Sequence, residues 1–545
     1  MSAKKLTCDV VIIGGGATGV GVLRDAAMRG LKAILVERVD LGQGTTGRYH
    51  GLLHSGGRYV VSDPHSATEC AEENAILTRI HPDAVEATGG LFVSVAGDDE
   101  EFPDRFFKGA EETGVPTAEI SVKEALRREP RLNPRIARAF EVQDGTVDGW
   151  RMVWGAVESA KAYGAQCLTY HRVTKIESRD GAVSGVVCHA DKSGKDVHIE
   201  CRAVVNAAGP WAGQIVKMAG ESGVEVVPGR GIMIAMNHRL VNSVINRCIY
   251  PADGDILVPV HTVSIIGTTD VRAEDPDHLK IEYDEVQQML DAGEDLIPGF
   301  RNSRALHVWA GARPLLKDTR VAADDTRHMS RGMSVVRHDV KGLITVAGGK
   351  LTTYRLMAAR VVDAVCEELG ENLVCRTADE PVAEGHNYKV THRLEVVEKA
   401  KNSDHGLPDK DPIICECEIV TKKMITDLLD EQPDATFDDL RRQLRIGMGP
   451  CQGGFCASRT AGIAHEHGCW SASQATELLR LFMKNRWGGI YPILNGAQAR
   501  EAALDEWIYH STFSVDDLPV TELPRGSELP SATRHPAPAP AGGAK

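Results

Sequence analysis

The chain has 545 residues, of which 42% are hydrophobic and 25% charged, a composition typical of an ordinary globular protein. Its formal net charge of −14 argues against nucleic acid as a general partner, so an anionic substrate must meet a local cluster of Arg and Lys. There is no apolar run of about 18 residues and no signal-peptide pattern. We therefore expect a cytoplasmic protein without a direct membrane span.

The first stretch of the chain predicts a dinucleotide-binding unit. Residues 9–38 read DVVIIGGGATGVGVLRDAAMRGLKAILVER, which is a buried strand, a glycine turn, a helix and a second strand. Gly14, Gly16 and Gly19 supply G-x-G-x-x-G, in which the glycines allow the tight turn, the approach of a pyrophosphate and close helix–strand packing. Glu37 ends the second strand, where an acid would accept a hydrogen bond from a ribose hydroxyl. The alternative is a glycine-rich turn in an ordinary α/β unit.

Strands and helices alternate through the next 300 or so residues. After a polar loop that carries several basic residues, we predict a helix over 66–81, a strand over 90–95 and a helical stretch over 101–129 with interruptions at Pro103 and Pro116. A helix after DGTVD and strands over 166–176, 182–189 and 197–207 follow. The last strand ends in VVNAAGPWAG. From residue 228 the segments VPGRGIMIAM, DILVPV and TVSIIGTT predict an antiparallel sheet.

Three strand–glycine–helix units thus lie at the beginning, in the middle and, as LITVAGGKLTTYR, near residue 350. We expect their strands to build one discontinuous Rossmann-like α/β domain, with the antiparallel sheet inserted as a substrate domain. An NAD enzyme needs only one such unit and often carries it in mid-chain. A fingerprint at the start, with a late unit returning to the same sheet, favours FAD, whose isoalloxazine ring must be held far from its adenine.

Four cysteines near the C-terminus form a separate pattern. Cys415-x-Cys417 and, after thirty-three residues, Cys451-x4-Cys456 make a four-thiolate set among glycines, whereas most other cysteines are scattered singly, as reduced thiols are. Four thiolates suit zinc or an iron–sulfur cluster. Structural zinc prefers C-x-x-C knuckles, so the spacing favours iron–sulfur, with zinc and an empty thiol cluster as alternatives. Cys469 is expected to lie outside the set.

The motifs together carry a family resemblance. The chain resembles the FAD-dependent glycerol-3-phosphate dehydrogenases, which have a D-amino-acid-oxidase-like fold. The matching segments are GGGATGVGVLRDAAMRGL, TTGRYHGLLHSGGRY, DGTVD, VVNAAGPWAG, WAGARPL and GGKLTTYR. The cysteine segment, with RIGMGPCQGGFC, is similar to the BFD-like [2Fe-2S] module of the catalytic A subunits of the anaerobic enzymes. The resemblance implies that FAD oxidises sn-glycerol 3-phosphate to glycerone phosphate.

The resemblance also implies where the electrons go. They would pass through a [2Fe-2S] centre and partner electron-transfer subunits to a membrane quinone, which implies a peripheral position at the inner face of the cell membrane. An FMN associated with such complexes would bind either this chain or a partner.

The same resemblance assigns roles to individual residues. A phosphate monoester, which bears close to two negative charges, would meet Arg58, Tyr59, Arg313, Arg331 and Lys350. His54 or His50 would take the hydroxyl proton, unless both are structural loop histidines, and Lys350 would stabilise the reduced flavin. The FAD ligands would be Gly14, Gly16, Ala17, Thr18, Gly19, Glu37, Arg38, Thr45, Thr46, Val173, Gly209, Trp211, Gly348, Gly349, Lys350, Leu351 and Thr352, and the cluster ligands Cys415, Cys417, Cys451 and Cys456.

We divide the chain accordingly. Residues 1–375 form the FAD-dependent oxidoreductase domain, with its FAD part over about 1–90, 150–225 and 335–375 and its substrate part over about 91–149 and 226–334. A linker over 376–411, the [2Fe-2S] domain over 412–465, a helical region over 466–512 and a disordered tail over 513–545 complete the chain.

Two other functions stay open at this point. The Arg and Lys set would also bind a carboxylate, so the same flavoenzyme would act on an amino acid or a 2-hydroxy acid. The non-enzymatic alternative is a redox-relay or scaffold protein with an inactive flavin pocket.

Overall fold

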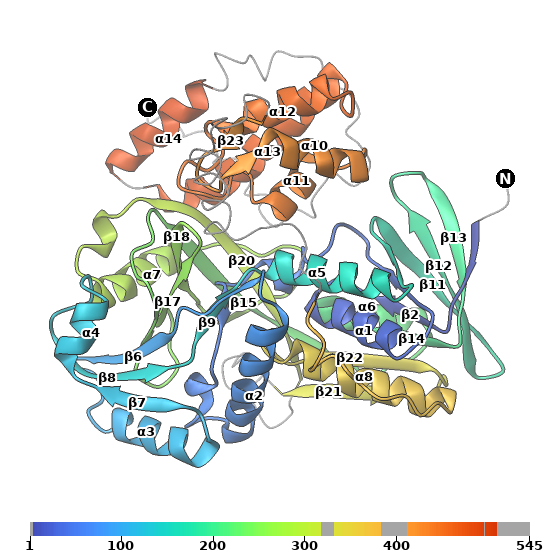
Figure 1. Cartoon of the computed structure of the whole chain (residues 1–545), viewed down its shortest axis with the longest axis horizontal. Helices are drawn as coiled ribbons and strands as arrows, with labels where there is room; N and C mark the ends of the chain where they lie inside the picture. The colour runs from blue at the N-terminus through green and yellow to red at the C-terminus, as the bar shows by residue number, and fades with distance from the viewer. Residues whose placement is uncertain (1–3, 318–331, 383–410, 495, 509–545) are drawn as a thin grey trace, which may run out of the picture.

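A six-stranded sheet collects strands from three distant parts of the chain (Figure 1). In this computed structural model, residues 4–317, 332–382, 411–494 and 496–508 are described. Arg331, most of the predicted linker and the whole predicted tail lie outside these ranges. The order of the sheet is β10 (Gln166–Leu168), β3 (Ala33–Val36), β2 (Val10–Ile13), β14 (Ala203–Asn206), β22 (Leu343–Gly348) and β21 (Met333–Arg337).

The first five of these strands pair in parallel, and β21 is antiparallel to β22. Strand β14 lies between β2 and β22, so the three predicted strand–glycine–helix units meet in one sheet. The predicted discontinuous α/β fold is confirmed.

The two faces of this sheet bury different sets of side chains, as alternation along a strand requires. One face packs on α1 (Ala17–Met28), α5 (Gly149–Ala162) and α8 (Tyr354–Leu369). The other packs on α6 (Ala212–Met218) and on a four-stranded sheet of β1 (Lys4–Thr7), β13 (Lys195–Glu200), β12 (Ala182–Ala190) and β11 (His171–Arg179).

A nine-stranded, mainly antiparallel sheet builds the second layer, on the left in Figure 1. Its strands are β19 (Val271–Arg272), β15 (Val226–Met236), β18 (Val263–Gly267), β17 (Ile256–Val260), β16 (Val244–Arg247), β6 (Gly90–Val95), β8 (Ile136–Val142) and β7 (Thr117–Ile120), with β20 (Ala305–Leu316) paired to β15. Helices α2 (Pro64–Ile80), α3 (Phe102–Thr113), α4 (Val122–Arg128) and α7 (Tyr283–Leu296) accompany it, and a small sheet of β4 (Leu52–Leu53), β9 (Gly145–Val147) and β5 (Val85–Glu86) lies beside it.

The C-terminal module has a hydrophobic core of its own and lies above both layers in Figure 1. It consists of β23 (Ile413–Cys415), β24 (Val420–Thr421), α10 (Lys422–Glu431), α11 (Phe437–Leu444), α12 (Cys456–Glu466), α13 (Ala472–Ile490) and α14 (Ala497–Trp507). Short 3-10 turns lie at Thr45–Gly47, Gly57–Tyr59, Gly209–Trp211, Phe300–Asn302 and Tyr491–Ile493. None of the helices in the described part of the chain is long and apolar enough to cross a membrane.

Three sequence expectations about secondary structure are wrong. The single strand expected over 166–176 is two strands, since β10 belongs to the six-stranded sheet and β11 to the four-stranded one. The stretch over 101–129 is not helical throughout, because Thr117–Ile120 forms β7 and pairs with β8 at the edge of the large sheet. The single strand expected over 197–207 is two strands, since β13 belongs to the four-stranded sheet and β14 to the six-stranded one. In all three cases the outcome depends on pairing with distant strands, which local sequence preference does not predict.

Helix α1 lies against the central sheet because Gly19 has no side chain. A Cβ at Gly19 would lie 1.8 Å from the carbonyl oxygen of Gly14 and 3.6 Å from the Cβ of Ala207. The contact with Gly14 is to backbone, which cannot move aside without breaking the turn that follows β2. The third glycine of the fingerprint is therefore required for packing.

We expect Gly19→Ala to destabilise the flavin domain by about 1–3 kcal/mol, because the added methyl group overpacks this contact. The temperature at which bound flavin is released should fall accordingly. Gly462→Ala in α12 is the matched control, since a Cβ there meets no atom within 4 Å. Equal melting of the two variants would contradict the assignment.

Candidate flavin and iron–sulfur sites

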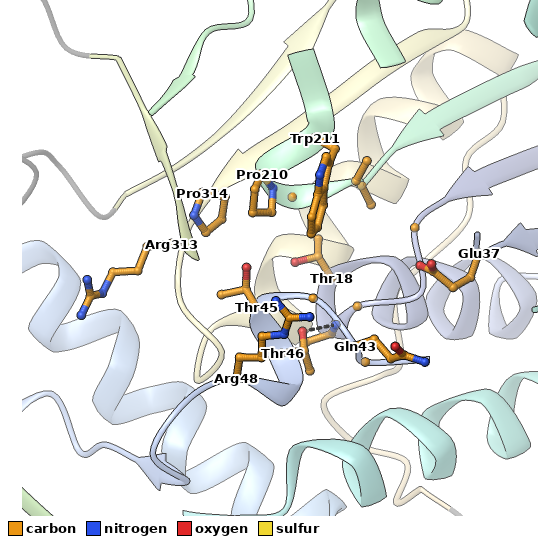
Figure 2. A pocket seen from close by; sticks show the side chains of 18 of the residues that line it. Thr18, Glu37, Gln43, Thr45, Thr46, Arg48, Pro210, Trp211, Arg313 and Pro314 are labelled. Carbon is orange, nitrogen blue, oxygen red and sulfur yellow. Dashed lines mark hydrogen bonds between the residues drawn. The ribbon is translucent and has the colours of Figure 1, made fainter. Parts of the chain in front are cut away.

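The carboxyl ends of the parallel strands open into a cavity of about 630 Å³ (Figure 2). Ile13, Val36 and Gly348 bring the ends of β2, β3 and β22 to its wall, and Ala207 follows β14 there. In open α/β sheets, ligands bind at this edge, where neighbouring connections diverge. The cavity thus lies where the fingerprint places a dinucleotide.

The cavity is cationic in a chain whose net charge is −14. Its lining contains five cationic side chains and two carboxylates: Arg38, Arg48, Arg172, Arg313 and Lys350 against Glu37 and Asp277. A local excess of positive charge attracts anions even when the whole molecule is negative. The arrangement therefore suits a ligand that carries phosphate groups.

The turn after β2 and the first residues of α1 line the cavity through Gly14, Gly16 and Ala17. Gly14 has φ of +114°, and a Cβ there would lie 2.6 Å from the carbonyl oxygen of Ala207. Gly16 begins α1 without a capping side chain of its own, and the N–H of Ala17 donates to Oγ1 of Thr46 over 3.0 Å (dashed line in Figure 2). The positive end of the α1 dipole thus faces the cavity, where it would stabilise a pyrophosphate.

Glu37 lines the cavity at the end of β3. Its Oε2 accepts the N–H of Gly15 over 2.7 Å and its Oε1 accepts the N–H of Val39 over 3.0 Å. Burial raises the pKa of the Glu37 carboxyl, and these two hydrogen bonds oppose that shift. A carboxylate has about four acceptor positions, so it retains the capacity to bind ribose hydroxyls.

A three-residue contact crosses the cavity between separate segments. The guanidinium of Arg38 lies 4.2 Å from the ring centroid of Trp211, and Asp277 accepts from both Arg38 (2.9 Å) and Nε1 of Trp211 (3.0 Å). Asp277 was missed by sequence reasoning, because it lies in a polar loop and belongs to no motif.

The wall residues fit a bound cofactor. Oε1 of Gln43 and Oγ1 of Thr352 are buried and have no hydrogen-bond partner within the described ranges, although both residues line the cavity. Buried polar atoms in folded proteins are nearly always paired, so these atoms indicate a polar ligand.

Arg48 projects beside Thr45 and Thr46 in Figure 2, and burial, with a smaller contribution from Arg38, lowers its pKa.

Arg48 and Gln43 were not predicted as site residues. Arg48 could have been found from its position in TTGR, two residues after the predicted Thr46. Gln43 had no recognisable signal.

The far end of the cavity gathers the predicted catalytic side chains. The rings of His54 and Tyr59 meet edge to face with centroids 5.2 Å apart. Nζ of Lys350 lies 5.0 Å from the Tyr59 ring centroid and donates to Oγ of Ser66 over 2.8 Å. Nδ1 of His50 accepts the N–H of Leu52 over 3.2 Å.

Arg313 reaches the cavity from β20 and is held on its other side. Its Nη1 lies 3.2 Å from Oδ1 of Asp270, and its Nη2 donates to the carbonyl oxygen of Thr269 over 3.0 Å and to the hydroxyl of Thr268. A Cβ at Gly231 would lie 2.8 Å from Nη2, so the glycine makes room for the guanidinium. This planar group is preorganised for an anion.

Arg58 is not among the residues that line the cavity. Its Nη1 donates to Oδ2 of Asp255 over 2.7 Å, and that carboxylate is almost fully buried. A buried carboxylate requires a cation, which draws Arg58 away from the ligand space.

Most of the remaining predicted site residues meet at this one cavity. Its lining includes Gly14, Gly16, Ala17, Thr18, Glu37, Arg38, Thr45, Thr46, His50, His54, Tyr59, Val173, Gly209, Trp211, Arg313, Gly348, Gly349, Lys350, Leu351 and Thr352. Gly19 lies behind it in the helix–sheet contact, and Arg331 falls outside the described residues. The roles of these residues remain predictions.

The four predicted thiols come together in the C-terminal module. The Sγ atoms of Cys417 and Cys451 lie 3.7 Å apart, and hydrogen bonds from Cys417 and Cys456 lower the pKa of Cys451. Cys456 in turn bonds Cys415 and lowers its pKa. These contacts link the four thiols in series, and within the described ranges no three His, Cys, Asp or Glu side chains surround a single ion position.

The loop that carries these thiols is shaped by glycine. A Cβ at Gly449 would lie 2.2 Å from the Cβ of Cys417, so only glycine fits beside that residue. Cys469 lies apart from the four, with its Sγ directed at the carbonyl oxygen of Leu429 over 3.9 Å. A set of four thiolates fits a [2Fe-2S] cluster.

Comparison with known families agrees with both sites. The family described as FAD dependent oxidoreductase matches residues 9–355, and the family described as BFD-like [2Fe-2S] binding domain matches residues 413–466. The chain is 40% identical to the A subunit of the anaerobic glycerol-3-phosphate dehydrogenase of Escherichia coli (strain K12), over 93% of this chain and 97% of that protein.

The chain belongs to the family of anaerobic glycerol-3-phosphate dehydrogenase A subunits. Another member, the A1 subunit of the Haloferax volcanii enzyme, is 39% identical over 94% of this chain and 92% of its own length. The predicted family resemblance is confirmed, and the chain combines an FAD-dependent oxidoreductase domain with a [2Fe-2S]-binding domain.

Solved structures support the fold of this family member. The glycerol-3-phosphate dehydrogenase from Bacillus halodurans, complexed with FAD, superposes with a TM-score of 0.67 at 20% identity, covering 90% of this chain and 96% of that one. Glycine oxidase from Geobacillus kaustophilus superposes with a TM-score of 0.54 at 20% identity, covering 70% of this chain and 99% of that one. At these identities the likeness shows the fold alone.

We expect Cys451→Ser to abolish the cluster, because the substitution removes one of four ligands. The purified variant should lose its iron and the EPR signal of the dithionite-reduced protein. Cys469→Ser, outside the thiol set, should retain both. Full iron occupancy in Cys451→Ser, or stoichiometric zinc in the unaltered protein, would contradict the assignment.

Proposed function

We propose that the chain oxidises sn-glycerol 3-phosphate to glycerone phosphate with FAD, and that the electrons leave through the [2Fe-2S] centre and partner subunits to a membrane quinone. One observation carries the proposal: a single cavity joins a nucleotide cradle at the sheet edge to a far end that contains Arg313, Lys350 and two histidines. Membership of the family that contains the Escherichia coli protein supports the substrate.

The far end of the cavity suits a phosphorylated alcohol. The guanidinium of Arg313 offers planar N–H donors and the ammonium of Lys350 a point charge, the pair of groups that a phosphate dianion requires. Asp270 and Ser66 hold these two cations in place before the substrate arrives. Their positions need little rearrangement on binding, which lowers the entropic cost.

His54 is the better general base of the two histidines. Nδ1 of His50 accepts the N–H of Leu52, so a neutral His50 carries its proton on Nε2 and acts as a donor. This tautomer makes His50 unsuited to accept the hydroxyl proton, which leaves the role to His54 at the same end of the cavity. A neutral imidazole is poised to take that proton near pH 7. When bound, FAD supplies the hydride acceptor for the C2 hydrogen.

The route out of the chain involves other proteins. The Escherichia coli and Haloferax volcanii relatives are named as subunits, which indicates assembly with other chains. We infer that partner subunits connect the [2Fe-2S] module to the quinone and hold this chain peripherally at the inner face of the membrane.

Anaerobic addition of sn-glycerol 3-phosphate to the purified chain tests the proposal. The flavin absorbance should bleach with that substrate and not with amino acids or 2-hydroxy acids. Bleaching only by an amino acid or a 2-hydroxy acid would mean that this compound, and not sn-glycerol 3-phosphate, is the substrate. If none of these compounds bleaches the flavin, the non-enzymatic alternative holds.

We expect Arg313→Met to raise KM for sn-glycerol 3-phosphate by a factor that corresponds to about 2–4 kcal/mol, because charge-assisted pairing with the phosphate is lost. Steady-state kinetics with an artificial acceptor provides the measurement. Arg179→Met, at an exposed position at the end of β11, should leave KM unchanged. An unchanged KM in Arg313→Met would place the phosphate elsewhere.

A further inference from the structure

Two buried arginines join the C-terminal module to the flavin domain. Arg442 lies in α11 and Arg445 directly after it, where α11 contacts α5 (Figure 1). Each guanidinium is buried and bridges a carboxylate of its own module to a carboxylate of the flavin domain. The module is thus docked through charge pairs that are largely buried.

Arg445 links the cluster loop to the start of α5. Its Nε donates to Oε2 of Glu418, the residue after Cys417, over 3.1 Å, and its Nη1 donates to Oδ2 of Asp148 over 2.9 Å. His261 lies 3.5 Å from Asp148 and 3.7 Å from Glu418. Burial alone would raise the pKa of Asp148, but Arg445 and His261 lower it below its usual range.

Arg442 makes the second link, to the loop that follows Glu37. Its Nε donates to Oδ2 of Asp40 over 2.8 Å, and its Nη2 donates to Oδ1 of Asp439 over 2.6 Å. The hydroxyl of Tyr170 donates to the same Asp439 oxygen over 2.6 Å. The side chains of Asp40, Asp439 and Arg442 are each less than a tenth exposed.

One contacted segment lines the flavin cavity through Glu37, Arg38 and Val39, and the other, the start of α5, packs behind the cavity loop. Asp148 caps α5 by accepting the N–H of Arg151 over 3.0 Å, and the hydroxyl of Tyr49 donates to the carbonyl of the preceding Val147. The nearby Trp150 packs on the cavity loop so closely that a Cβ at Gly47 would lie 2.6 Å from its Nε1. A displacement of the module would therefore shift the start of α5 and, through it, the cavity loop over 42–50.

Buried ion pairs of this kind specify geometry more than they add stability. Desolvation offsets much of their attraction, but a buried charge that loses its partner is strongly unfavourable. Only one orientation of the module pairs both arginines with both carboxylates of the flavin domain. The network therefore selects a single docked position.

We propose that Arg445, through Asp148, is a positioning residue that fixes the [2Fe-2S] module against the start of α5, behind the loop that lines the flavin cavity, so that reduced flavin delivers its electrons to the cluster of the same chain. The inference rests on the proposed function. Two-electron-reduced flavin is oxidised in two single-electron transfers, the cluster is reduced in each, an external one-electron acceptor regenerates it, and two protons are released to water.

Asp148→Asn is the principal variant, because asparagine still caps α5 and leaves Arg445 paired with Glu418. Arg445→Met is the second variant. Flavin in the full, cluster-loaded chain is photoreduced by a light flash with a sacrificial amine such as EDTA as the electron donor, and cluster reduction is followed by its absorbance and by EPR. We expect both variants to slow cluster reduction by about ten-fold or more while the flash reduces their flavin as in the unaltered chain, since small misplacements of reacting partners are costly.

The matched control lies at the same interface. Lys192→Met removes a pair with the largely exposed Asp434 at 3.0 Å and the contact of its ammonium with the Tyr170 ring, while both buried arginine links stay intact. It should leave the rate unchanged. A second readout uses the iron-free chain: amides in α11 and in residues 42–50 should exchange hydrogen faster in Arg445→Met than in Lys192→Met.

Cluster reduction in Asp148→Asn at the rate of the unaltered chain would overturn the inference, as would equal hydrogen exchange in Arg445→Met and Lys192→Met. Because the light flash replaces substrate, these outcomes do not depend on glycerol 3-phosphate. Absence of bleaching by that substrate in the unaltered chain would instead overturn the proposed function.

Discussion

The pairing of β14 with β2 on one side and β22 on the other is the interaction on which the rest of the molecule depends. These three strands are separated by more than a hundred residues from one to the next, and their residues are almost wholly buried. Their carboxyl ends meet at one edge because the pairing is parallel. Without β14 at the centre, the fingerprint at Gly14 and the basic segment at Lys350 would not face the same cavity.

Positive charge is concentrated around the cavity at that edge of the six-stranded sheet. The chain as a whole is acidic, yet cations outnumber carboxylates around the cavity, and Arg313 and Lys350 are held by neighbours that do not neutralise the whole group of cations. Electrostatic interactions are stronger in such a partly desolvated site than at the surface. The same physics removes Arg58 from the ligand space, since the buried carboxylate of Asp255 binds it. Position in a motif therefore does not by itself decide which arginine meets the substrate.

The module interface uses charge in a different way. Arg442 and Arg445 neutralise carboxylates on both sides of a buried boundary, so that the iron–sulfur module and the flavin loop share one electrostatic network. Apolar packing alone would tolerate small shifts of one surface over another, whereas four carboxylates and two guanidinium groups do not. A fixed position suits a module whose role is to accept electrons from one neighbouring site.

The sequence by itself determined what depends on neighbours along the chain. The glycine fingerprint, Glu37 and the cysteine spacing predicted a dinucleotide cradle and a cluster site, because local turns and ligand spacing are set over a few residues, and the family resemblance added Thr45 and Thr46. Only the tertiary structure decided that β7 is a strand, that β13 and β14 belong to different sheets, and that Asp277, Asp148 and Asp40 have partners from other segments. Such contacts join residues far apart in the chain, and their energies arise from burial that no local pattern records.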